Sequence, residues 1–425
     1  MKRLIKKCIP PFVLNAYFAA WAYAGVLLYR DPSRKLKVIG VTGTNGKTSV
    51  THVASDLLEH SGVKVASISS LRFKIGEREW TNRFKMTMPG RMHIQKFMRD
   101  AVDAGCEVLV MEVTSEGVRQ KRHLGIHFDT AVFTNLTPEH IESHGSFEKY
   151  RAAKGEFFAR PHRVSIINAD DPEADYFVDF SAQRTITYSA EGLRLPGEHL
   201  CAEGAQASRE GISFTLDGVE FSAALLGRFN ISNLLAALGI CQALGINAAS
   251  LGEAVRALRG VPGRAEIVKS EPTVVVDYAH TPDGLTKIYE MVQSVRPSGG
   301  RTICVLGSAG GGRDKWKRPE LGAIASGFCD EIILTDEDPY DEEPRAIVAD
   351  IEEGMDGVAH EVIMDRRAAI AAALKRATSE DVVVVTGKGA EPWMVKAGGV
   401  KVPWDDRAVV REESAGLKMD KADVS

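Results

Sequence analysis

The fold of this chain is decided by one stretch, Gly40-Val41-Thr42-Gly43-Thr44-Asn45-Gly46-Lys47-Thr48-Ser49. An apolar, β-branched run, Lys37–Val41, leads into it, and an amphipathic run of helical length, Val50–His60, follows it. A strand, a glycine-rich loop and a helix in that order form the context that a phosphate-binding loop requires. Glycines let the backbone amides turn toward a phosphate, and the helix N-terminus adds a favourable dipole. The stretch therefore predicts an α/β domain that binds a nucleoside triphosphate.

The loop residues that we expect to bind ATP are Gly43, Thr44, Asn45, Gly46, Lys47, Thr48 and Ser49. Lys47 can bridge the β- and γ-phosphate oxygens, and the Thr48 hydroxyl can ligate Mg²⁺. The spacing departs from GxxxxGK[ST], because Val41 stands at the first glycine position and Gly43 lies inside the loop. A plain glycine-rich turn is the alternative. The strand before the loop, the Lys-Thr pair and the helix after it argue against that alternative.

Outward from the loop, short β-branched runs alternate with amphipathic runs of helical length. The runs expected to form strands are Lys37–Val41, Val63–Ser69, Val108–Val113, Thr130–Thr134 and Val164–Asn168. This alternation predicts a mainly parallel sheet. Between Thr185 and Leu226 the runs become short and are punctuated by glycine, which predicts antiparallel hairpins attached to the first domain. A helix is expected at Asn230–Leu244.

A second α/β series begins after the turn Val261-Pro262-Gly263-Arg264. Its expected strands are Thr273–Val276, Thr302–Leu306, Glu331–Thr335, Glu361–Met364 and Asp381–Thr386. Each ends in a glycine-rich or acidic loop, and open α/β sheets bind ligands beyond the carboxyl ends of their strands. We therefore predict an apolar N-terminal helix segment at 1–35, a central P-loop ATP-binding domain at 36–262 and a Rossmann-like C-terminal α/β domain at 263–425. The polar end, Gly416–Ser425, is expected to fray.

The composition excludes several classes of protein. A chain of 425 residues is too long for one ordinary core, so two globular domains are expected. The net charge of −4 is spread over charges of both signs, and no run of Lys and Arg alternates with aromatic residues, so nucleic acid is not an expected partner. Six cysteines lie far apart without a CxxC pair: Cys8, Cys106, Cys201, Cys241, Cys304 and Cys329. We interpret them as reduced, mostly buried thiols, not as a disulfide framework or a zinc site.

The N-terminal segment is unusually apolar. No charged residue lies between Cys8 and Tyr29, and four basic residues precede this run: Lys2, Arg3, Lys6 and Lys7. Export is not expected, because the ATP loop starts a few residues later and ATP is a cytoplasmic substrate. The run is comparable in length to a transmembrane helix of ~20 residues, although Pro10 and Pro11 shorten its helical part. Two interpretations stay open: residues 9–29 associate with a membrane surface, or they form an apolar helix docked on the protein or on a partner.

The loop sequence Thr-Gly-Thr-Asn-Gly-Lys-Thr, residues 42–48, resembles that of the Mur ligase family, which includes the peptidoglycan peptide ligases and folylpolyglutamate synthase. Independent segments carry the same likeness in the same order: Asn135-Leu136, Glu139-His140, His144-Gly145 and Ala152-Ala153-Lys154. In two places the chain departs from the pattern. Glu139 stands where the family usually has Asp, and Glu116 stands where the tripeptide-forming members usually have His.

The resemblance implies an ATP-dependent ligase that uses two Mg²⁺ ions. The metal ligands that it assigns are Thr48, Glu112, His140 and Lys154, with Lys154 carbamylated by CO₂. A carboxylate-like ligand would neutralise a dication that an ammonium would repel. Taken alone, Lys154 would be read as a solvated helical lysine, and the ordered set of segments argues against that reading.

The same resemblance assigns the adenine and ribose contacts. Asn230 and Asn233 lie three residues apart on one face of the expected helix, where family members contact the base; helix capping is the alternative. Asp277 follows the first strand of the second domain and is placed for the ribose hydroxyls, while Arg264 lies at the hinge between the domains. Closure of the two domains on ATP would exclude water from an acyl phosphate.

The C-terminal domain resembles that of the ligases that add the third residue of the peptidoglycan stem. One of its loops ends in Lys317-Arg318-Pro319, and Lys317 could neutralise the transferring phosphoryl group. The substrate-binding residues that the likeness implies are Thr87, Ser115, Asp338, Tyr340, Gly387 and Glu391. Diaminopimelate-adding members carry Arg where this chain has Tyr340, which is followed by the acidic residues 341–343. An acidic pocket favours lysine or ornithine over diaminopimelate, and a solvated acidic turn is the alternative.

The implied reaction is phosphorylation of a muropeptide carboxylate by ATP, attack of an amino acid on the acyl phosphate, and release of ADP and phosphate. We expect the catalytic residues to be Lys47, Lys154, His140 and Lys317. The ligases that add the third residue of the stem carry an N-terminal UDP-binding domain of roughly one hundred residues, whereas residues 1–36 precede the first expected strand here. Either UDP is held otherwise, or the acceptor lacks it, as a lipid-linked muropeptide would. The open alternatives are a folylpolyglutamate or polyamino-acid ligase and a non-catalytic ATP-binding partner subunit.

Overall fold

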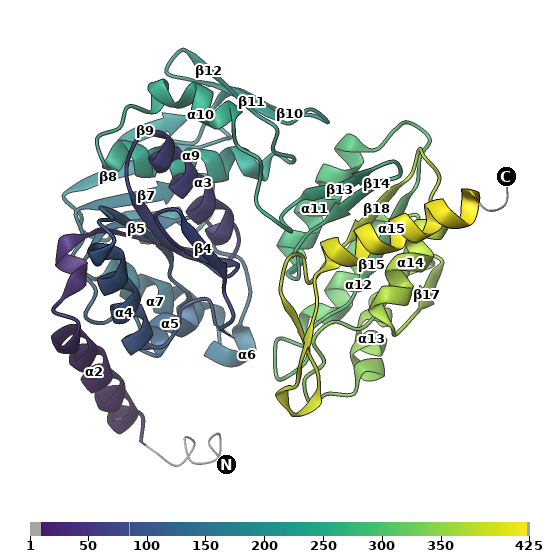
Figure 1. The fold of residues 1–425 in the computed structure, drawn as a ribbon, viewed down its shortest axis with the longest axis horizontal. Helices are drawn as coiled ribbons and strands as arrows, with labels where there is room; N and C mark the ends of the chain where they lie inside the picture. The colour runs from purple at the N-terminus through teal and green to yellow at the C-terminus, as the bar shows by residue number, and fades with distance from the viewer. Residues whose placement is uncertain (1–9, 85, 423–425) are drawn as a thin grey trace.

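Two sheets organise the residues that the computed structural model describes, which are 10–84 and 86–422 (Figure 1). A nine-stranded sheet forms the framework of what we call the central domain, and a six-stranded sheet forms that of the C-terminal domain. The first nine residues, with Cys8 and the four basic residues that precede the apolar segment, lie outside the described part of the chain.

The nine-stranded sheet has the order β4-β3-β2-β5-β1-β6-β7-β8-β9. The bounds of its strands are β1 Lys37–Thr42, β2 Val65–Ile68, β3 Arg72–Ile75, β4 Arg78–Thr81, β5 Val108–Glu112, β6 Phe128–Phe133, β7 Val164–Asn168, β8 Arg184–Ser189 and β9 Glu198–Cys201. β1 lies between β5 and β6 and is parallel to both, while β3 and β4 form an antiparallel hairpin at one edge. All of β1 after Lys37 is buried, because helices cover both faces of the sheet.

Helices cover both faces of this sheet, as the sequence predicts for a βαβ architecture. Their bounds are α3 Lys47–His60, α4 Arg91–Asp103, α5 Ser115–Arg119, α6 Ile141–His144, α7 Phe147–Phe158, α8 Ala174–Val178, α9 Phe229–Ala243 and α10 Gly252–Arg256. α3 and α9 pack with β1 in one apolar core, and α4 and α7 pack against the opposite face in a second core. Because β1, β5, β6 and β7 are parallel, their carboxyl ends lie at the same edge of the sheet.

The segment between Thr185 and Leu226 differs from the prediction of antiparallel hairpins. β8 and β9 extend the central sheet in parallel, and only the strands after them form a separate antiparallel sheet: β10 Glu203–Ala207, β11 Ile212–Leu216 and β12 Val219–Ala223. β8 joins the large sheet because Ile186 and Tyr188 pack in the same core as α9, so the strand is buried although its sequence alternates.

The C-terminal sheet has the order β13-β14-β18-β15-β16-β17. The bounds are β13 Glu266–Ser270, β14 Thr273–Val276, β15 Thr302–Leu306, β16 Glu331–Leu334, β17 His360–Val362 and β18 Val382–Val385. β13 is antiparallel to β14 at the edge and was not among the expected strands, because its polar side chains alternate weakly. The other strands are parallel, as the prediction of a Rossmann-like domain requires.

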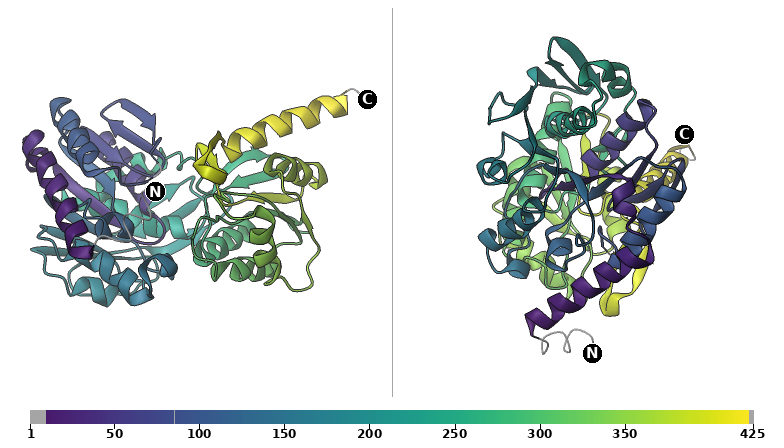
Figure 2. Two further views of the ribbon diagram at one scale, coloured as in Figure 1. Left: turned by 90° about the horizontal axis from the view of Figure 1, so that it is seen from below. Right: turned by 90° about the vertical axis from the view of Figure 1, so that its left-hand side faces the viewer.

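Helices also cover both faces of the second sheet. Their bounds are α11 Pro282–Val295, α12 Lys317–Phe328, α13 Pro344–Glu352, α14 Arg366–Arg376 and α15 Asp406–Ala422, and a hairpin of β19 Trp393–Val395 and β20 Lys401–Pro403 precedes α15. Figure 2 shows α15 leaving the domain as a long helix. The helix continues to Ala422, so the prediction that residues from Gly416 onward fray is wrong for most of that segment.

Two of the six cysteines form a disulfide, which corrects the expectation that all are free thiols. Cys304 lies in β15, and Cys329 follows α12, with their Cα atoms 6.0 Å apart. The pair meets because α12 returns the chain to the start of β16, which lies beside β15. A separation of 25 residues gives no such signal in the sequence. The free cysteines of the described residues are Cys106, Cys201 and Cys241.

The apolar N-terminal segment forms α2, Pro11–Leu28, which lies along α4 (Figures 1 and 2). Phe18 and Ala22 are buried in this contact, and the guanidinium of Arg91 lies 4.0 Å from the centre of the Phe18 ring. Much of the rest of the helix is exposed, including the aromatic side chain of Trp21 and the aliphatic side chain of Leu27. Among the described residues, no helix is both long and apolar enough to cross a membrane.

Candidate active site

A cavity of about 1120 Å³ lies between the two domains, at the carboxyl edge of the central sheet. The loop Gly43–Ser49 lines it, together with Glu112 at the end of β5 and His140 after β6. From the C-terminal domain, the segment Tyr278–Thr281 and the loop residue Arg313 complete its wall. The cavity therefore joins the phosphate loop to loops of the second domain, as the strand-end positions predict.

The phosphate loop is held by the strand-end residue Asn135. The backbone amide of Thr44 donates to the Asn135 carbonyl oxygen at 2.9 Å, and the amide of Asn45 donates to Asn135 Oδ1 at 2.8 Å. Gly46 has a φ of +83°, and a Cβ atom there would lie 2.5 Å from Asn233 Oδ1. Glycine is required at this position for both its backbone conformation and its lack of a side chain.

Lys47 bends back over the loop. Its Nζ donates to the carbonyl oxygens of Gly43 at 2.9 Å and Thr44 at 2.7 Å. Burial lowers the pKa of Lys47, although nearby Glu112 opposes this effect. The Lys47 amine thus lies against the backbone of the phosphate loop, where phosphate oxygens could replace its two carbonyl contacts.

Thr48 and Glu112 lie together, as the prediction of a Mg²⁺ site requires. Thr48 Oγ1 donates to Glu112 Oε1 at 2.9 Å, and the same carboxylate oxygen accepts from the backbone amide of Ser70 at 2.7 Å. Glu112 is 1% exposed. A hydroxyl and a carboxylate beside a phosphate loop are oxygen ligands that suit Mg²⁺, so the residues present fit this ion.

Lys154 and His140 lie near each other around Tyr150. Lys154 is 2% exposed, its Nζ donates to the Gly43 carbonyl oxygen at 2.7 Å, and it lies 4.6 Å from the centre of the Tyr150 ring. Burial, with a smaller effect of Lys47, lowers the pKa of Lys154 well below its ordinary value. The unprotonated amine is the form that reacts with CO₂, and burial favours this form, so the surroundings of Lys154 are compatible with a carbamate.

His140 reaches the cavity from a left-handed backbone conformation with a φ of +58°. Desolvation by the surrounding protein, followed by the charge of Lys154, lowers the pKa of His140, although solvent reaches the residue. A neutral imidazole is the form that ligates metals. No group of three or more His, Cys, Asp or Glu side chains within residues 10–84 and 86–422 is arranged to hold a metal by itself.

The predicted adenine residues form a pair in α9. Asn233 Nδ2 donates to Asn230 Oδ1 at 2.9 Å, and Asn230 Nδ2 donates to the carbonyl oxygen of Leu226 at 2.7 Å. Asn233 lines the cavity beside Gly46, whereas Asn230 lies behind it and is not among the lining residues. Asn230 is therefore placed to orient Asn233 rather than to contact a base.

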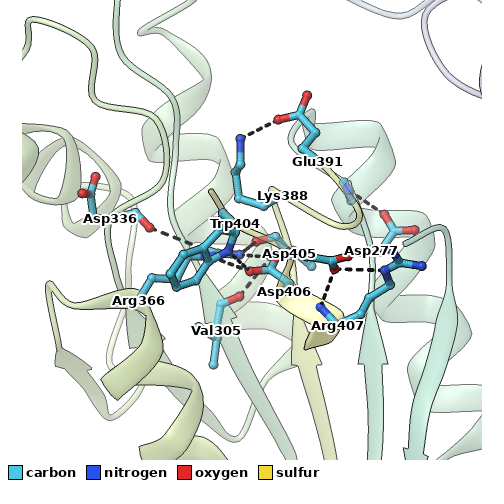
Figure 3. Close-up of polar contacts among 12 residues, drawn as sticks. Asp277, Val305, Asp336, Arg366, Lys388, Glu391, Trp404, Asp405, Asp406 and Arg407 are labelled. Atoms are coloured by element: carbon cyan, nitrogen blue, oxygen red, sulfur yellow. Dashed lines mark hydrogen bonds and ion pairs between the residues drawn. The ribbon is translucent and has the colours of Figure 1, made fainter. Parts of the chain in front are cut away.

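Asp277 lines the cavity, but its carboxylate is already used by the backbone of the hinge. Asp277 Oδ2 accepts from the amide of Ala265 at 2.6 Å, and Oδ1 accepts from the amide of Ala279 at 2.5 Å. Figure 3 shows this side chain directed to the hinge backbone. Burial raises the pKa of Asp277, with Arg264 opposing that effect. The geometry favours a role in holding the hinge over the predicted contact with ribose hydroxyls.

Arg264 connects the hinge to the phosphate loop. Its guanidinium carbon lies 4.2 Å from the centre of the Tyr278 ring, and Nη2 donates to Thr48 Oγ1 at 3.3 Å. A second contact spans the domains, because Asn45 Nδ2 donates to Asp283 Oδ2 at 2.9 Å. Both domains thus touch the predicted ATP loop, and the structure brings Arg264 to the place that the sequence predicts.

On the acceptor side, the cavity wall contains Thr87 and Ser115, as predicted. Ser115 Oγ lies 3.2 Å from His144 Nε2. Glu116, which replaces the expected His, also lines the cavity and pairs with Arg119. These residues come from the loop before α4 and from the start of α5, so the acceptor side is built entirely by the central domain.

The predicted amino-acid residues lie together, but only Glu391 is among the residues that line the cavity. Asp338 Oδ1 accepts from Lys388 Nζ at 3.0 Å. Lys388 Nζ also donates to Glu391 Oε2 at 2.5 Å (Figure 3). Gly387 lies beside them with a φ of +105°. Asp338, Gly387 and Tyr340 form a layer behind the cavity wall, which corrects the expectation that all of them line the site.

Tyr340 is covered by Arg313, whose Nη2 lies 3.3 Å from the tyrosine hydroxyl oxygen. The acidic residues that follow Tyr340 do not form a pocket wall. Asp341 accepts from the amide of Gly398, and Glu342 pairs with Arg318 and Lys315. The solvated-turn interpretation therefore describes this acidic run better than the predicted acidic pocket.

Lys317 occupies a different place from the one that the sequence predicts. Its Nζ lies 2.9 Å from Glu139 Oε1 and 3.2 Å from Oε2, with both side chains buried, and Lys317 is not among the cavity-lining residues. The Glu139 carboxylate neutralises the positive charge of Lys317, which the sequence predicts would contact the transferring phosphoryl group. The pair is one of the contacts that join the two domains.

Comparisons with known proteins agree with this geometry. The sequence profile of the Mur ligase middle domain matches residues 41–241, and that of the Mur ligase glutamate ligase domain matches residues 263–389. The chain belongs to the Mur ligase family. The Mur ligase assignment accounts for the phosphate loop, the strand-end carboxylate and the two α/β domains together.

Two relatives are similar to this Mur ligase over most of its length. UDP-N-acetylmuramoyl-L-alanyl-D-glutamate--2,6-diaminopimelate ligase of Gloeobacter violaceus is 41% identical over 397 residues, which cover 90% of this chain and 78% of that protein. UDP-N-acetylmuramyl-tripeptide synthetase of Roseiflexus sp. (strain RS-1) is 37% identical, with 94% of this chain and 82% of that protein covered. A solved structure of a UDP-N-acetylmuramoyl-L-alanyl-D-glutamate--2,6-diaminopimelate ligase has a TM-score of 0.61 at 30% identity and covers 90% of this chain and 79% of that one.

Membership has direct consequences for this chain. Mur ligases are ATP- and Mg²⁺-dependent amide ligases of peptidoglycan precursor synthesis, and this chain is one of them. The predicted family and fold class are therefore confirmed. A ligase of this family needs separate binding sites for ATP, for a carboxylate and for an amine, so we expect different walls of the cavity to bind each of them.

The sequence analysis did not predict a role for three charged residues of this Mur ligase: Arg122 and Arg313, which line the cavity, and Glu337, which is buried in the C-terminal domain. Arg122 is buried at the acceptor side, contacts Met88 O, Gln120 and Met86, and has no carboxylate partner in the described chain. Arg313 lines the opposite wall. Glu337 is 3% exposed, and its Oε2 has no hydrogen-bond partner among the described residues. A single charged residue in a turn or loop, such as Arg122 after α5 or Arg313 in the glycine-rich loop, gives no signal of this kind without the fold.

Proposed function

We propose that this Mur ligase joins an amino acid to the carboxylate of a muropeptide in the cytoplasm, through an acyl phosphate formed at the expense of ATP. We further propose that residues 36–262 bind ATP and the acceptor, and that residues 263–425 supply the amino-acid site. One observation supports the proposal: the cavity has the phosphate loop in the middle, Arg122 on one side and Arg313 with Glu391 on the other, and Arg122 has no carboxylate partner among the described residues. A nucleotide, an anionic acceptor and an amino acid can thus meet in one enclosed space.

The residues of the phosphate loop would bind and orient the ATP. The amides of Thr44 and Asn45 already donate to Asn135, so the backbone amides at the N-terminus of α3 would bind the phosphates. Lys47 would exchange its carbonyl contacts for phosphate oxygens. Arg122 would bind an anionic group of the acceptor, because its guanidinium has no carboxylate partner in the described chain. No protein nucleophile is required, since the acceptor carboxylate itself attacks the γ-phosphorus.

We propose two Mg²⁺ sites at the residues already described. Thr48 with Glu112 would hold one ion, and His140 with a carbamylated Lys154 would hold the other. Each ion would supply charge neutralisation for the phosphoryl group during transfer. Carbamylation needs only CO₂: the neutral Lys154 amine attacks its carbon, one proton leaves, and the lysine becomes an anionic ligand. The buried, weakly basic amine supports this step.

For the amino acid we propose lysine or ornithine. Lys388 pairs with both Asp338 and Glu391, and Arg is absent from position 340. Without an Arg at that position, the second carboxylate of diaminopimelate lacks the bidentate partner expected there, which supports the proposal. Diaminopimelate is the competing candidate, because relatives of this chain are named as its ligases. Turnover measured with each amino acid decides the question, and a strict preference for diaminopimelate contradicts this part of the proposal.

We also propose that α2 associates with a membrane surface, without crossing it. Its exposed side chains include Tyr17, Trp21, Tyr23, Leu27 and Leu28. The sequence has four basic residues before this helix and no acidic residue before Asp31, which complements an anionic bilayer. An acceptor carried on a membrane lipid would then be accessible to the enzyme.

Vesicle sedimentation with the full-length chain tests the membrane proposal. Binding to phosphatidylglycerol vesicles, weaker binding to phosphatidylcholine vesicles and loss of binding in Leu27→Glu are expected, because Leu27 is 81% exposed and its replacement leaves the contact with α4 intact. A wild-type chain that stays in the supernatant with both kinds of vesicle contradicts the proposal.

The ligase proposal is tested by ADP release and by the mass of the product. ADP is expected only when ATP, a muropeptide and an amino acid are all present, and the product should gain the mass of the amino acid less one water. ADP release that requires a folate and glutamate instead would support the folylpolyglutamate alternative. The absence of nucleotide-dependent turnover with every acceptor would support a non-catalytic partner subunit.

A further inference from the structure

The loop before α12 contacts α6 across the domain boundary. Asp314 is 2% exposed, and its carboxylate oxygens accept from the backbone amides of Ile141 at 3.3 Å and Glu142 at 2.9 Å. In return, Glu142 Oε1 accepts from the backbone amide of Lys315 at 2.7 Å. These are reciprocal hydrogen bonds between a loop of the C-terminal domain and the first turn of a helix in the central domain.

α6 has no cap of its own. The residue that precedes it is His140, which is left-handed and makes no side-chain hydrogen bond to the helix amides. The free amides of a first helical turn need an acceptor, and an aspartate is among the preferred side chains for this purpose. Asp314 supplies that acceptor from the other domain, so this four-residue helix is capped only when the domains are together.

The Asp314 contact lies directly beside His140, and a second contact lies on its other side. Glu139 precedes His140 and forms the buried pair with Lys317. The backbone on both sides of His140 is thus fixed by the same loop of the C-terminal domain. A left-handed backbone is unfavourable for a residue other than glycine, so it needs such support from its surroundings.

We infer that Asp314 is a positioning residue that couples domain closure to His140, by capping α6 in the closed arrangement and so fixing the imidazole toward the cavity. The inference rests on the proposed function, in which His140 ligates an ion. When the C-terminal domain moves away, α6 loses its cap and its fixed start, and His140 loses the constraint on its backbone. Closure of the domains therefore strengthens metal binding, and metal binding stabilises the closed arrangement to the same extent.

Mn²⁺ binding in the presence of ADP tests this coupling with a readout other than activity. Free Mn²⁺ is measured by electron paramagnetic resonance for the wild type and for Asp314→Ala, Asp314→Asn and Lys315→Ala. Asp314→Ala is expected to weaken Mn²⁺ binding by about tenfold, the usual effect of losing a residue that orients a ligand. Asp314→Asn, which keeps one acceptor oxygen, should lose less. Lys315→Ala is the matched control, because its side chain pairs with Glu342 of its own domain.

A double-mutant cycle separates positioning from a general loss of structure. If Asp314 acts through His140, Asp314→Ala should cause no further loss of Mn²⁺ affinity in a His140→Ala background. Losses that multiply in the double variant, or wild-type affinity in Asp314→Ala, would overturn the inference. An equal loss in Lys315→Ala would overturn it too, because the effect would then belong to the loop as a whole. Unchanged Mn²⁺ affinity in His140→Ala alone would instead refute the proposed metal role of His140.

Discussion

Lys47 and Lys154 donate to the same atom, the carbonyl oxygen of Gly43, at 2.9 and 2.7 Å. The two amines come from the phosphate loop and from α7, which are more than one hundred residues apart in the sequence. The proximity of Lys47 adds to the burial that lowers the pKa of Lys154. One backbone carbonyl thus connects the nucleotide side of the cavity with the lysine that we propose to be carbamylated.

Replacement of Lys154 tests the carbamate. Lys154→Ala is expected to lower kcat by at least about a hundredfold, because the proposed anionic ligand is lost. Acetate or another short acid should restore part of the activity by occupying the vacated space. Lys149→Ala is the control, because Lys149 lies on the same helix and is exposed. Wild-type activity in Lys154→Ala, or equal stimulation of both variants by acetate, would refute the carbamate.

Gly46 tests whether the phosphate loop tolerates a side chain. In Gly46→Ala the new Cβ would lie 2.5 Å from Asn233 Oδ1 in a left-handed backbone, so we expect the Kd for ATP to rise by more than about tenfold.

Gly62→Ala separates the two causes of that effect. Gly62 has a φ of +81°, close to that of Gly46, but nothing lies within 4 Å of its added Cβ. We therefore expect similar backbone strain, about 1 kcal/mol of lost stability, and unchanged ATP binding measured by calorimetry. Equal ATP affinities for the two variants would contradict the role assigned to the loop.

Glu337 gives a pH-dependent stability. Burial raises the pKa of Glu337 from 4.5 to about 7, although Lys388 opposes this effect. The folded state therefore holds the proton at pH values where the unfolded chain has lost it. The corresponding stabilisation is present below about pH 4.5 and is lost as the pH rises toward 7.

The comparison with Glu337→Gln measures this effect, because glutamine does not titrate. Between pH 5 and pH 8, the free energy of unfolding of the wild type should fall relative to that of Glu337→Gln by about 1–3 kcal/mol. Urea denaturation at several pH values gives the difference. A difference that is constant with pH, or that grows in favour of the wild type, would show that Glu337 is ionised throughout.

The buried pair Arg366–Asp406 ties α14 to the start of α15 (Figure 3). The guanidinium makes two hydrogen bonds to the carboxylate, at 2.8 and 2.7 Å, and the side chains are 1% and 0% exposed. Arg366→Ala should lower the free energy of unfolding by about 3–5 kcal/mol, because it leaves a buried charge without its partner. The neighbouring Arg367 pairs with Glu412 at the surface, so Arg367→Ala should change the free energy of unfolding by less than about 0.5 kcal/mol. If urea denaturation gives the same loss of unfolding free energy for Arg366→Ala and Arg367→Ala, the difference assigned to the buried and the exposed pair is contradicted.

The fold was predictable where one residue pattern leads to one structure. The strand, glycine loop and helix around Lys47 have a distinctive order, and the strand β7 has the bounds that its apolar run predicts. β8 was assigned to the wrong kind of sheet because its alternating sequence fits an antiparallel hairpin, while α9 covers it in the folded chain. The disulfide of Cys304 was not predictable, since it depends on which strands become neighbours.

The candidate site was predictable on its nucleotide side and less so on its substrate side. Glu112 lies at a strand end beside the loop, so topology alone brings it to Thr48. The partner of Lys317 depends on how two separately folded domains meet, which no local pattern encodes. For the same reason Tyr340 was expected in the cavity wall, whereas Arg313 covers it.

The acyl phosphate is the central claim, and oxygen transfer tests it most directly. The acceptor carboxylate is labelled with ¹⁸O and incubated with the full-length enzyme, ATP, Mg²⁺ and the amino acid, and the released phosphate is analysed by mass spectrometry. Attack of the carboxylate on the γ-phosphorus predicts one ¹⁸O atom in each phosphate, because the amine later displaces that oxygen with the phosphoryl group. Unlabelled phosphate, or release of AMP and pyrophosphate in place of ADP, would contradict the mechanism.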